Sequence, residues 1–296
     1  MSIPFTCPHC QAQTSVDDRY AGQTGPCSHC GKPITIPNPM GVAHAPAPAA
    51  RGGNALVLVA IVVGGGFVML FIIGILVALL LPALQVARSA ARRAQSMNNL
   101  KQINLALLNY ESTYGTFPPA YIADADGKPM HSWRVRILPF MEQQALYQRY
   151  NFDEPWDGPN NRLFHDTVVP AYVDPATPDG PTSYTSYVVV TGANTMFPGA
   201  EAVAMKDVLD GLSNTIMVVT TTDEDILWCE PRDLEFDSMS FQVNDPENSC
   251  ISSEYPGGAP VGLGDGSVRF LQDDLDMNAL QSLLLLDDSV VAAPAE

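Results

Sequence analysis

The feature that most constrains this chain is an unbroken apolar run from Ala55 to Leu81, which contains no charged or strongly polar side chain. At ~1.5 Å per helical residue, the run is longer than the ~30 Å hydrocarbon core of a bilayer. A buried helix of a soluble protein is rarely this long, and the run lies too far into the chain for a secretory signal peptide. The sequence therefore predicts one transmembrane helix over residues 55–81, with membrane lipids as partners.

Four of the six cysteines lie before this run in two C-x2-C motifs, which read C-P-H-C and C-S-H-C. Each motif places two thiolates in one tight turn, and two such turns complete a tetrahedral zinc site. Four thiolates leave no open coordination position, and a segment of about 35 residues buries too little core to fold without metal. We therefore predict a structural Zn²⁺ ribbon over residues 1–36, with two disulfides as the alternative; its ligands are Cys7, Cys10, Cys27 and Cys30.

Composition divides the remaining chain into parts with different surroundings. Residues 37–54 are rich in Pro, Ala and Gly and predict a flexible linker. The net charge is −17, and residues 112–296 hold 29 of the 32 acidic side chains but only 8 of the 15 basic ones. Nucleic acid is not expected as a partner, because phosphate binding needs clustered Lys and Arg.

The large C-terminal part has no G-x-S-x-G, H-E-x-x-H or phosphate-loop motif, so we expect a protein that is not an enzyme.

The residues after the apolar run predict an α+β domain. Apolar residues recur at helical spacing from Leu100 to Tyr114, so the helix is expected to continue over residues 82–115 and to end at Gly115, with a kink at Pro82. We expect the domain itself to span residues 116–275, with an acidic tail over 276–296. A further helical pattern covers 131–150, and strands are predicted at 187–191, 216–222, 261–263 and 268–271.

Five segments carry a resemblance to a known family. They resemble the bacterial pilin-like family that has a prepilin-type N-terminal helix and a processing-associated H-x9-DG domain of unknown function. The resemblance implies a long helix packed on an antiparallel sheet, and pilin-like or secretion-system proteins as partners. The matching segments are Gly74–Tyr121, Ser132–Asp157, Ser186–Gly192, Asp210–Val218 and Gly264–Leu271.

The chain departs from the pattern of that family at three places. With Gly74 aligned, the usual Glu of the mature helix falls on Gly65, and the cleavage point falls on residues 60–61, where neither element is present. The resemblance therefore implies that the zinc ribbon stays attached and that filament incorporation is not expected. The His of the motif falls on Tyr255, which nine residues separate from the Asp265-Gly266 pair, and we expect this pair to form a hairpin turn.

Two further sites have alternative interpretations. Cys229 and Cys250 are predicted to form a disulfide that adds roughly 3 kcal/mol in an oxidising compartment, with two buried free thiols as the alternative. Oxygen-bearing residues at 210–214 and 223–225 could bind Ca²⁺, but no D-x-[DN]-x-[DN]-G loop occurs, which favours ordinary turns.

Charge and redox chemistry give opposite orientations for the membrane helix. The basic residues at 88–101 would place the C-terminal side in the cytoplasm, whereas a thiolate zinc site suits a reducing compartment. The family resemblance supports a cytoplasmic ribbon, an inner-membrane helix and an extracytoplasmic domain. We expect a structural or interaction role in the cell envelope, as an accessory of secretion or assembly; the alternative is a transmembrane sensor or ligand-binding protein that couples an outer domain to the ribbon.

Overall fold

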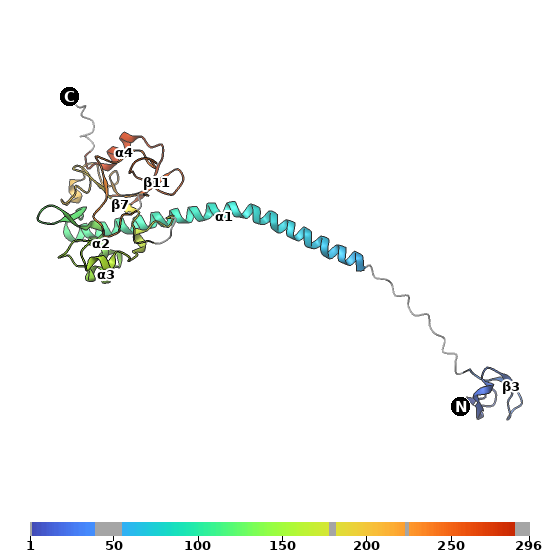
Figure 1. Ribbon diagram of the computed structural model, residues 1–296. Helices are drawn as coiled ribbons and strands as arrows, with labels where there is room; N and C mark the ends of the chain where they lie inside the picture. Colours follow the sequence, from blue (N-terminus) through green and yellow to red (C-terminus); the bar gives the residue numbers. More distant parts are fainter. Residues whose placement is uncertain (1, 39–54, 178–181, 223–224, 288–296) are drawn as a thin grey trace. The chain divides into compact units, whose positions relative to one another are not determined.

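The computed structural model describes residues 2–38, 55–177, 182–222 and 225–287, apart from the side chains of 55–63, 67 and 68 (Figure 1). The chain divides into two compact units, Met1–Ile75 and Leu76–Glu296, and the boundary between them falls within one long helix. Almost all of the predicted linker, from residue 39 to residue 54, lies outside the described residues. The two units are described separately below.

The first unit contains two antiparallel β-hairpins, and each hairpin turn carries one C-x2-C motif. Its buried residues are few: Cys7, Cys27 and Ile34, with Phe5 and Cys30 packed against them. Such a small core cannot stabilise a fold by apolar burial alone. The hairpins pair β1 (Ser2–Thr6) with β2 (Gln13–Asp17) and β3 (Thr24–Pro26) with β4 (Pro33–Thr35), and the 3-10 helix η1 (Asp18–Tyr20) follows β2.

Helix α1 (Ala55–Tyr114) is 60 residues long and runs through Pro82 without ending. Its large apolar side chains between Met69 and Val86 are exposed, whereas its C-terminal part buries one face in the domain. The predicted stripe is confirmed at Leu100, Ile103, Leu107 and Tyr110, which are all buried, but Tyr114 at its end is 57% exposed.

Helix α1 ends at Gly115, as the sequence predicts. This glycine has a φ of 81°, a left-handed conformation that glycine adopts without steric cost. Its N–H donates to the carbonyl of Glu111 at 2.6 Å.

A four-stranded antiparallel sheet packs on this helix, in the order β12-β11-β9-β7. The two layers approach closely where Asn104 of α1 meets Gly262 of β11: a Cβ at Gly262 would lie 2.3 Å from Asn104 Nδ2. The mixed α+β class is therefore confirmed. The strands are β7 (Tyr187–Val188), β9 (Ile216–Thr220), β11 (Gly258–Leu263) and β12 (Val268–Gln272).

The predicted strand at 187–191 is two strands. After β7 the chain leaves the main sheet, and β8 (Val190–Thr191) pairs in parallel with β10 (Leu234–Glu235). The cause is Asp233, whose carboxylate accepts the N–H of Val189 at 3.0 Å and so takes this residue out of the strand ladder. A side chain 44 residues away along the sequence thus divides the β-branched run.

The predicted helical segment at 131–150 is shorter and more broken than expected. It consists of α2 (Trp133–Ile137), the 3-10 helix η2 (Leu138–Met141) and α3 (Gln144–Arg149). Figure 1 shows α2 and α3 on one side of the end of α1, and β11 and α4 on the other. The remaining elements are β5 (Tyr121–Ala123), β6 (Pro129–Ser132), η3 (Asn161–Phe164), η4 (Pro170–Tyr172) and η5 (Met205–Asp207).

The prediction of an acidic tail over 276–296 is wrong for its first part. Asp276 accepts the N–H groups of Asn278 and Ala279 and so begins a helix, α4 (Met277–Leu284). Leu280 and Leu284 of this helix are buried in the core of the domain. An amphipathic helix, not a solvated tail, follows the last strand; residues 288–296 lie outside the described residues.

Candidate functional site

The four cysteines of the first unit come together in one cluster. Their Sγ atoms all lie within 4.8 Å of one another, and the Cys7–Cys30 and Cys10–Cys27 pairs are each separated by 3.9 Å. Four thiolates arranged tetrahedrally around zinc, with Zn–S distances of ~2.3 Å, would be about 3.8 Å apart. A disulfide needs an S–S distance of ~2.05 Å, so the alternative of two disulfides does not fit.

The backbone explains why these motifs place their thiols correctly. In both turns the N–H of the residue after the second cysteine donates to the carbonyl of the first, from Gln11 to Cys7 at 2.9 Å and from Gly31 to Cys27 at 2.8 Å. Both Gln11 and Gly31 have positive φ, 57° and 71°. The chain thus reverses within each motif, and both cysteines of a motif face the same point.

The hydrogen bonds at Cys27 favour the form that binds metal. The N–H groups of His29 and Cys30 point to this sulfur and lower the pKa of Cys27 to about 6. A thiolate, not a thiol, is the metal ligand, so these two N–H groups favour the form of Cys27 that coordinates. Within the described residues, these four cysteines form the cluster of His, Cys, Asp or Glu side chains whose ligand atoms lie close enough together to hold a metal ion.

The residues considered for Ca²⁺ do not form such a group where they are described. Asn214 donates its side-chain amide to the carbonyl of Asp210 at 3.0 Å, and Gly211 has a φ of 85°. These are the features of a turn. Asp223 and Glu224 lie outside the described residues.

The residues at the predicted family motif lie at opposite ends of strand β11. Tyr255 precedes the strand, and Asp265 and Gly266 form the turn after it, so ~20 Å of extended chain separates them. The turn is as predicted: Gly266 has a φ of 87°, and Asp265 Oδ1 accepts the N–H of Ser267 at 2.8 Å. The structure does not bring the three residues into one site.

Tyr255 instead joins a buried polar cluster on helix α1. Its Oη donates to Asp174 Oδ1 at 2.6 Å, and Ser96 of α1 donates to the other oxygen of the same carboxylate. Ser96 also lies 3.1 Å from the hydroxyl of Tyr187. The sequence analysis missed Asp174 and Ser96. The sequence did contain one indication: Ser96 lies four residues before Leu100, so it falls on the helix face that the apolar stripe predicts to be buried.

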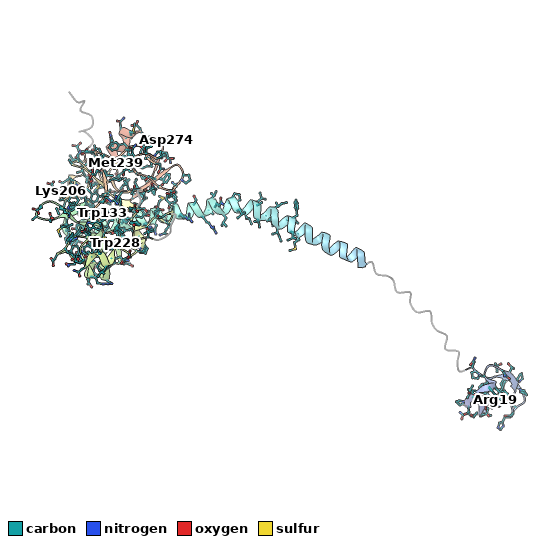
Figure 2. The ribbon with its side chains drawn as sticks, in the orientation of Figure 1. Arg19, Trp133, Lys206, Trp228, Met239 and Asp274 are labelled. Carbon is teal, nitrogen blue, oxygen red and sulfur yellow. The ribbon has the colours of Figure 1, made fainter. Side chains whose placement is uncertain are left out.

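A second buried polar group holds the domain together and was also missed. Arg134 of α2 and Asp233 form an ion pair at 2.5 Å, with 0% and 3% of their side chains exposed. Asp233 Oδ1 also accepts from Trp133 Nε1 at 3.1 Å, and Arg134 Nε donates to the carbonyl of Tyr187 at 2.9 Å. Figure 2 shows Trp133 inside the domain. The pair therefore ties α2 to strand β7 and to the segment before β10.

Cys229 and Cys250 are not joined by a disulfide. Cys229 belongs to the same hydrophobic core cluster as Leu100 of α1, and burial there raises its pKa to about 12. Cys250 is also buried, and its Sγ lies 3.6 Å from the carbonyl of Asp245. The structure corrects the predicted bridge: the two residues have different neighbours and are held as thiols.

Fold and site together define a class of protein: an α+β domain on a helix long and apolar enough to cross a membrane, preceded in the sequence by a module of four clustered cysteines that could hold a metal ion. The chain belongs to the family described as protein of unknown function (DUF1559), whose model matches residues 85–239. That range begins after the apolar run and ends after β10, so it leaves out the cysteine module and the residues at 255–266. No curated protein and no solved structure matches the chain.

Proposed function

We propose that this chain is a single-pass membrane protein without enzymatic activity, whose α+β domain has a structural or interaction role in the cell envelope. The observation that carries this proposal is the division of helix α1 into two parts. Side chains of its C-terminal part help to fill the domain core, whereas the large apolar side chains from Met69 to Val86 are exposed.

An aqueous environment does not suit the exposed part of α1. Leu70, Phe71 and Val86 are each exposed by more than 65%, and nine of the fourteen residues between Phe71 and Val86 are Ile, Leu or Val. Each such side chain costs about 1.5–3 kcal/mol when it stays in water. A bilayer removes this cost, and a helix satisfies its own backbone hydrogen bonds there.

The resemblance to pilin-like proteins supports a role in secretion or assembly. It rests on the prepilin-type helix, on the segments from Ser132 to Val218 and on Tyr255, Asp265 and Gly266 as counterparts of the H-x9-DG motif. The helix that enters a domain and packs on its antiparallel sheet agrees with this relationship. We propose an inner-membrane location, with the zinc ribbon in the cytoplasm and the large domain outside, since four thiolates need a reducing compartment.

The test is the fractionation of the full chain after an alkaline carbonate wash. The wild-type chain should stay in the membrane pellet, because its apolar helix is embedded in lipid. Leu76→Arg combined with Leu80→Arg should release much of it, since each arginine costs about 2.5–3.5 kcal/mol at the centre of a helix in the membrane. Ser89→Arg, on the same helix beyond the apolar run, is the control and should stay in the pellet. A wild-type chain found in the soluble fraction would refute the proposal.

One observation favours the alternative function of a transmembrane sensor. Asp174 lines a cavity in the domain, and its carboxylate accepts a hydrogen bond from Ser96 on the helix that would cross the membrane. A ligand in this cavity would therefore lie one residue away from α1. The test is whether a bound ligand changes the rate at which a cysteine placed by Arg88→Cys reacts with a thiol reagent. An unchanged rate would argue against a sensor.

A further inference from the structure

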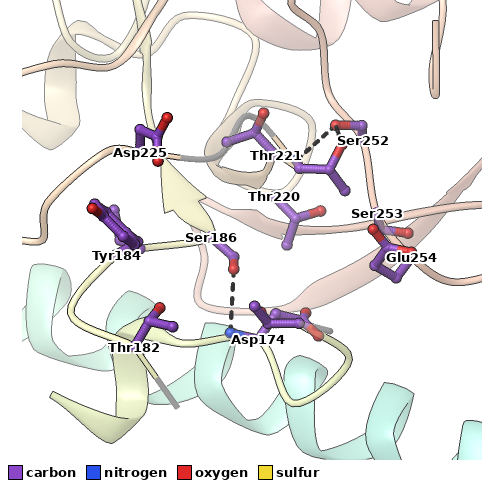
Figure 3. Close-up of a pocket in the computed structure, with 13 residues that line it drawn as sticks. Asp174, Thr182, Tyr184, Ser186, Thr220, Thr221, Asp225, Ser252, Ser253 and Glu254 are labelled. Atoms are coloured by element: carbon purple, nitrogen blue, oxygen red, sulfur yellow. Dashed lines mark hydrogen bonds between the residues drawn. The ribbon is translucent and has the colours of Figure 1, made fainter. Parts of the chain in front are cut away.

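A cavity of about 160 Å³ opens in the domain beside the end of β9 (Figure 3). Its described wall comes from separate parts of the chain: residues 174–177 and 182–186, residues 220–222 with Asp225, and residues 252–254. Figure 3 shows their side chains around a common space, with Asp174 on the side next to α1. At ~30 Å³ for each water molecule in the liquid, this volume corresponds to about five waters, and therefore to a small ligand such as one sugar ring.

The chemistry of the wall is uniform. All thirteen of the described residues that line the cavity carry a side-chain oxygen: ten are Ser, Thr or Tyr hydroxyls, and three are the carboxylates of Asp174, Asp225 and Glu254. None of the thirteen carries a side-chain nitrogen. Hydroxyls both donate and accept hydrogen bonds, and carboxylates only accept. The wall thus suits a ligand with many O–H or N–H donors, and its negative charge opposes phosphate and carboxylate groups.

Part of the wall consists of buried residues that are hydrogen-bonded to one another. Thr220, Thr221, Ser252 and Asp174 are each less than one-tenth exposed. Ser252 Oγ accepts the N–H of Thr222 at 2.8 Å and lies 2.9 Å from the hydroxyl of the same threonine. Hydroxyls held in this way bind with a smaller loss of side-chain entropy.

The hydroxyl-lined wall also includes one aromatic ring. Ser186 Oγ accepts the backbone N–H of Asp174 at 3.3 Å and keeps its own hydrogen for another partner. At the rim, the aromatic ring of Tyr184 is 42% exposed. A sugar ring has the matching distribution, with hydroxyls around its edge and an apolar C–H face that can lie on an aromatic ring.

We propose that this cavity is a carbohydrate site that accepts neutral or amino sugars and rejects acidic ones. The carboxylates of Asp225 and Glu254 are placed to attract a protonated amine. Because the site lies within the domain and contains no residue of the membrane helix, the proposal does not depend on the anchoring function.

The experiment measures binding of three sugars of similar size and different charge to the full chain in lipid nanodiscs. Glycoside detergents are avoided, because their head groups are themselves sugars. Ligand-detected saturation-transfer NMR with glucosamine, glucose and glucuronate should show binding strongest for glucosamine, weaker for glucose and absent for glucuronate. The proposal fails if none of the three binds, or if glucuronate binds as well as glucosamine.

Two variants locate the binding in this cavity. Tyr184→Ala removes the ring from the rim and should weaken both glucosamine and glucose by about tenfold. Glu254→Gln should weaken glucosamine by about tenfold and leave glucose nearly unchanged, since only the amine interacts with the charge. Glu201→Gln, an exposed carboxylate that does not line the cavity, is the matched control and should change neither. Equal effects of Glu254→Gln and Glu201→Gln would place the sugar elsewhere and overturn the proposal.

Discussion

At the scale of single residues, the strongest constraint on the domain is the ion pair between Arg134 and Asp233. Both charges are removed from water, which is costly unless each is paired and hydrogen-bonded. The structure meets this condition, because Asp233 also accepts from Trp133 and Val189, and Arg134 also donates to Ser132 Oγ and to backbone carbonyls. Loss of one partner would leave the other charge buried and alone.

We therefore predict that Asp233→Leu lowers the free energy of unfolding of the domain by about 3–5 kcal/mol. Arg232→Met serves as the control, because it breaks the neighbouring pair with Glu230, in which the Arg232 side chain is 50% exposed. That change should cost about 1 kcal/mol or less. Chemical denaturation followed by tryptophan fluorescence measures both. Similar losses for the two variants would contradict this account.

The cysteine cluster predicts one bound metal ion per chain. Purified full-length protein should contain one zinc by elemental analysis, and Cys10→Ser should reduce the content strongly, because three thiolates and a hydroxyl bind zinc less well than four thiolates. Ser28→Ala changes an exposed residue within the same pair of motifs and should retain the metal. Metal content that is unaffected by Cys10→Ser would show that the cluster is not the site.

His131 makes the domain sensitive to acid. Nε2 lies 3.1 Å from the carbonyl of Phe152 and so carries the proton, and Nδ1 accepts from Tyr150 Oη at 3.1 Å. Burial lowers the pKa of His131 below its ordinary 6.5. As the pH falls below 6.5, the unfolded chain takes up the proton before the folded one, so the free energy of unfolding decreases.

We accordingly expect the melting temperature of the domain to fall between pH 7.5 and pH 5.5, and to fall less in His131→Gln. The substitution will itself lower stability. The quantity to compare is therefore the change in melting temperature between the two pH values in each protein, not the melting temperature itself. An equal fall in melting temperature for the variant and the wild type would rule out His131 as the source of the acid sensitivity.

At the scale of elements, the contact between α1 and β11 decides how the domain is attached to its helix. Gly262 allows the strand to approach Asn104, whose Nδ2 donates to the carbonyl of Ser267 at 3.2 Å and whose Oδ1 is buried without a partner. A methyl group at residue 262 would overlap this amide, which lies 2.3 Å away. A glycine is required at this position because the helix and the sheet lie so close together, and not because of its backbone φ angle.

Gly262→Ala should therefore lower the free energy of unfolding by about 1–3 kcal/mol, the usual cost of overpacking. In the double variant with Asn104→Ala, the added methyl group has space, so the two changes together should cost less than the sum of each alone. A double-mutant cycle by chemical denaturation measures this coupling. Strict additivity would show that the residues do not meet as described.

At the scale of the whole molecule, the proposed topology requires the two ends of α1 to lie on opposite sides of a membrane. Ser15 and Ser238 are exposed residues of the cysteine module and of the large domain, so Ser15→Cys and Ser238→Cys give matched reporters. A membrane-impermeant maleimide should label Ser238→Cys in spheroplasts and Ser15→Cys only after permeabilisation. The reverse pattern, or labelling of both in intact spheroplasts, would refute the orientation.

The sequence alone determined the features that depend on near neighbours. These are the apolar length of α1, the spacing of the four cysteines, the stripe from Leu100 to Tyr110, and the glycine turns at Gly115 and Gly266. Each follows from the period of a helix or from the reach of a few bonds. Helix α4 was missed although its sequence contains no acidic residue; the burial of its apolar side depends on a core formed elsewhere in the chain.

Only the tertiary structure decided the contacts between distant residues. The pairing of Arg134 with Asp233 spans 99 residues, and that of Ser96 with Asp174 spans 78. The parallel pairing of β8 with β10 and the hydroxyl-lined cavity also join segments that carry no common pattern. A polar side chain in a sequence can satisfy its hydrogen bonds in water or within the protein, and the choice depends on which segments fold against it.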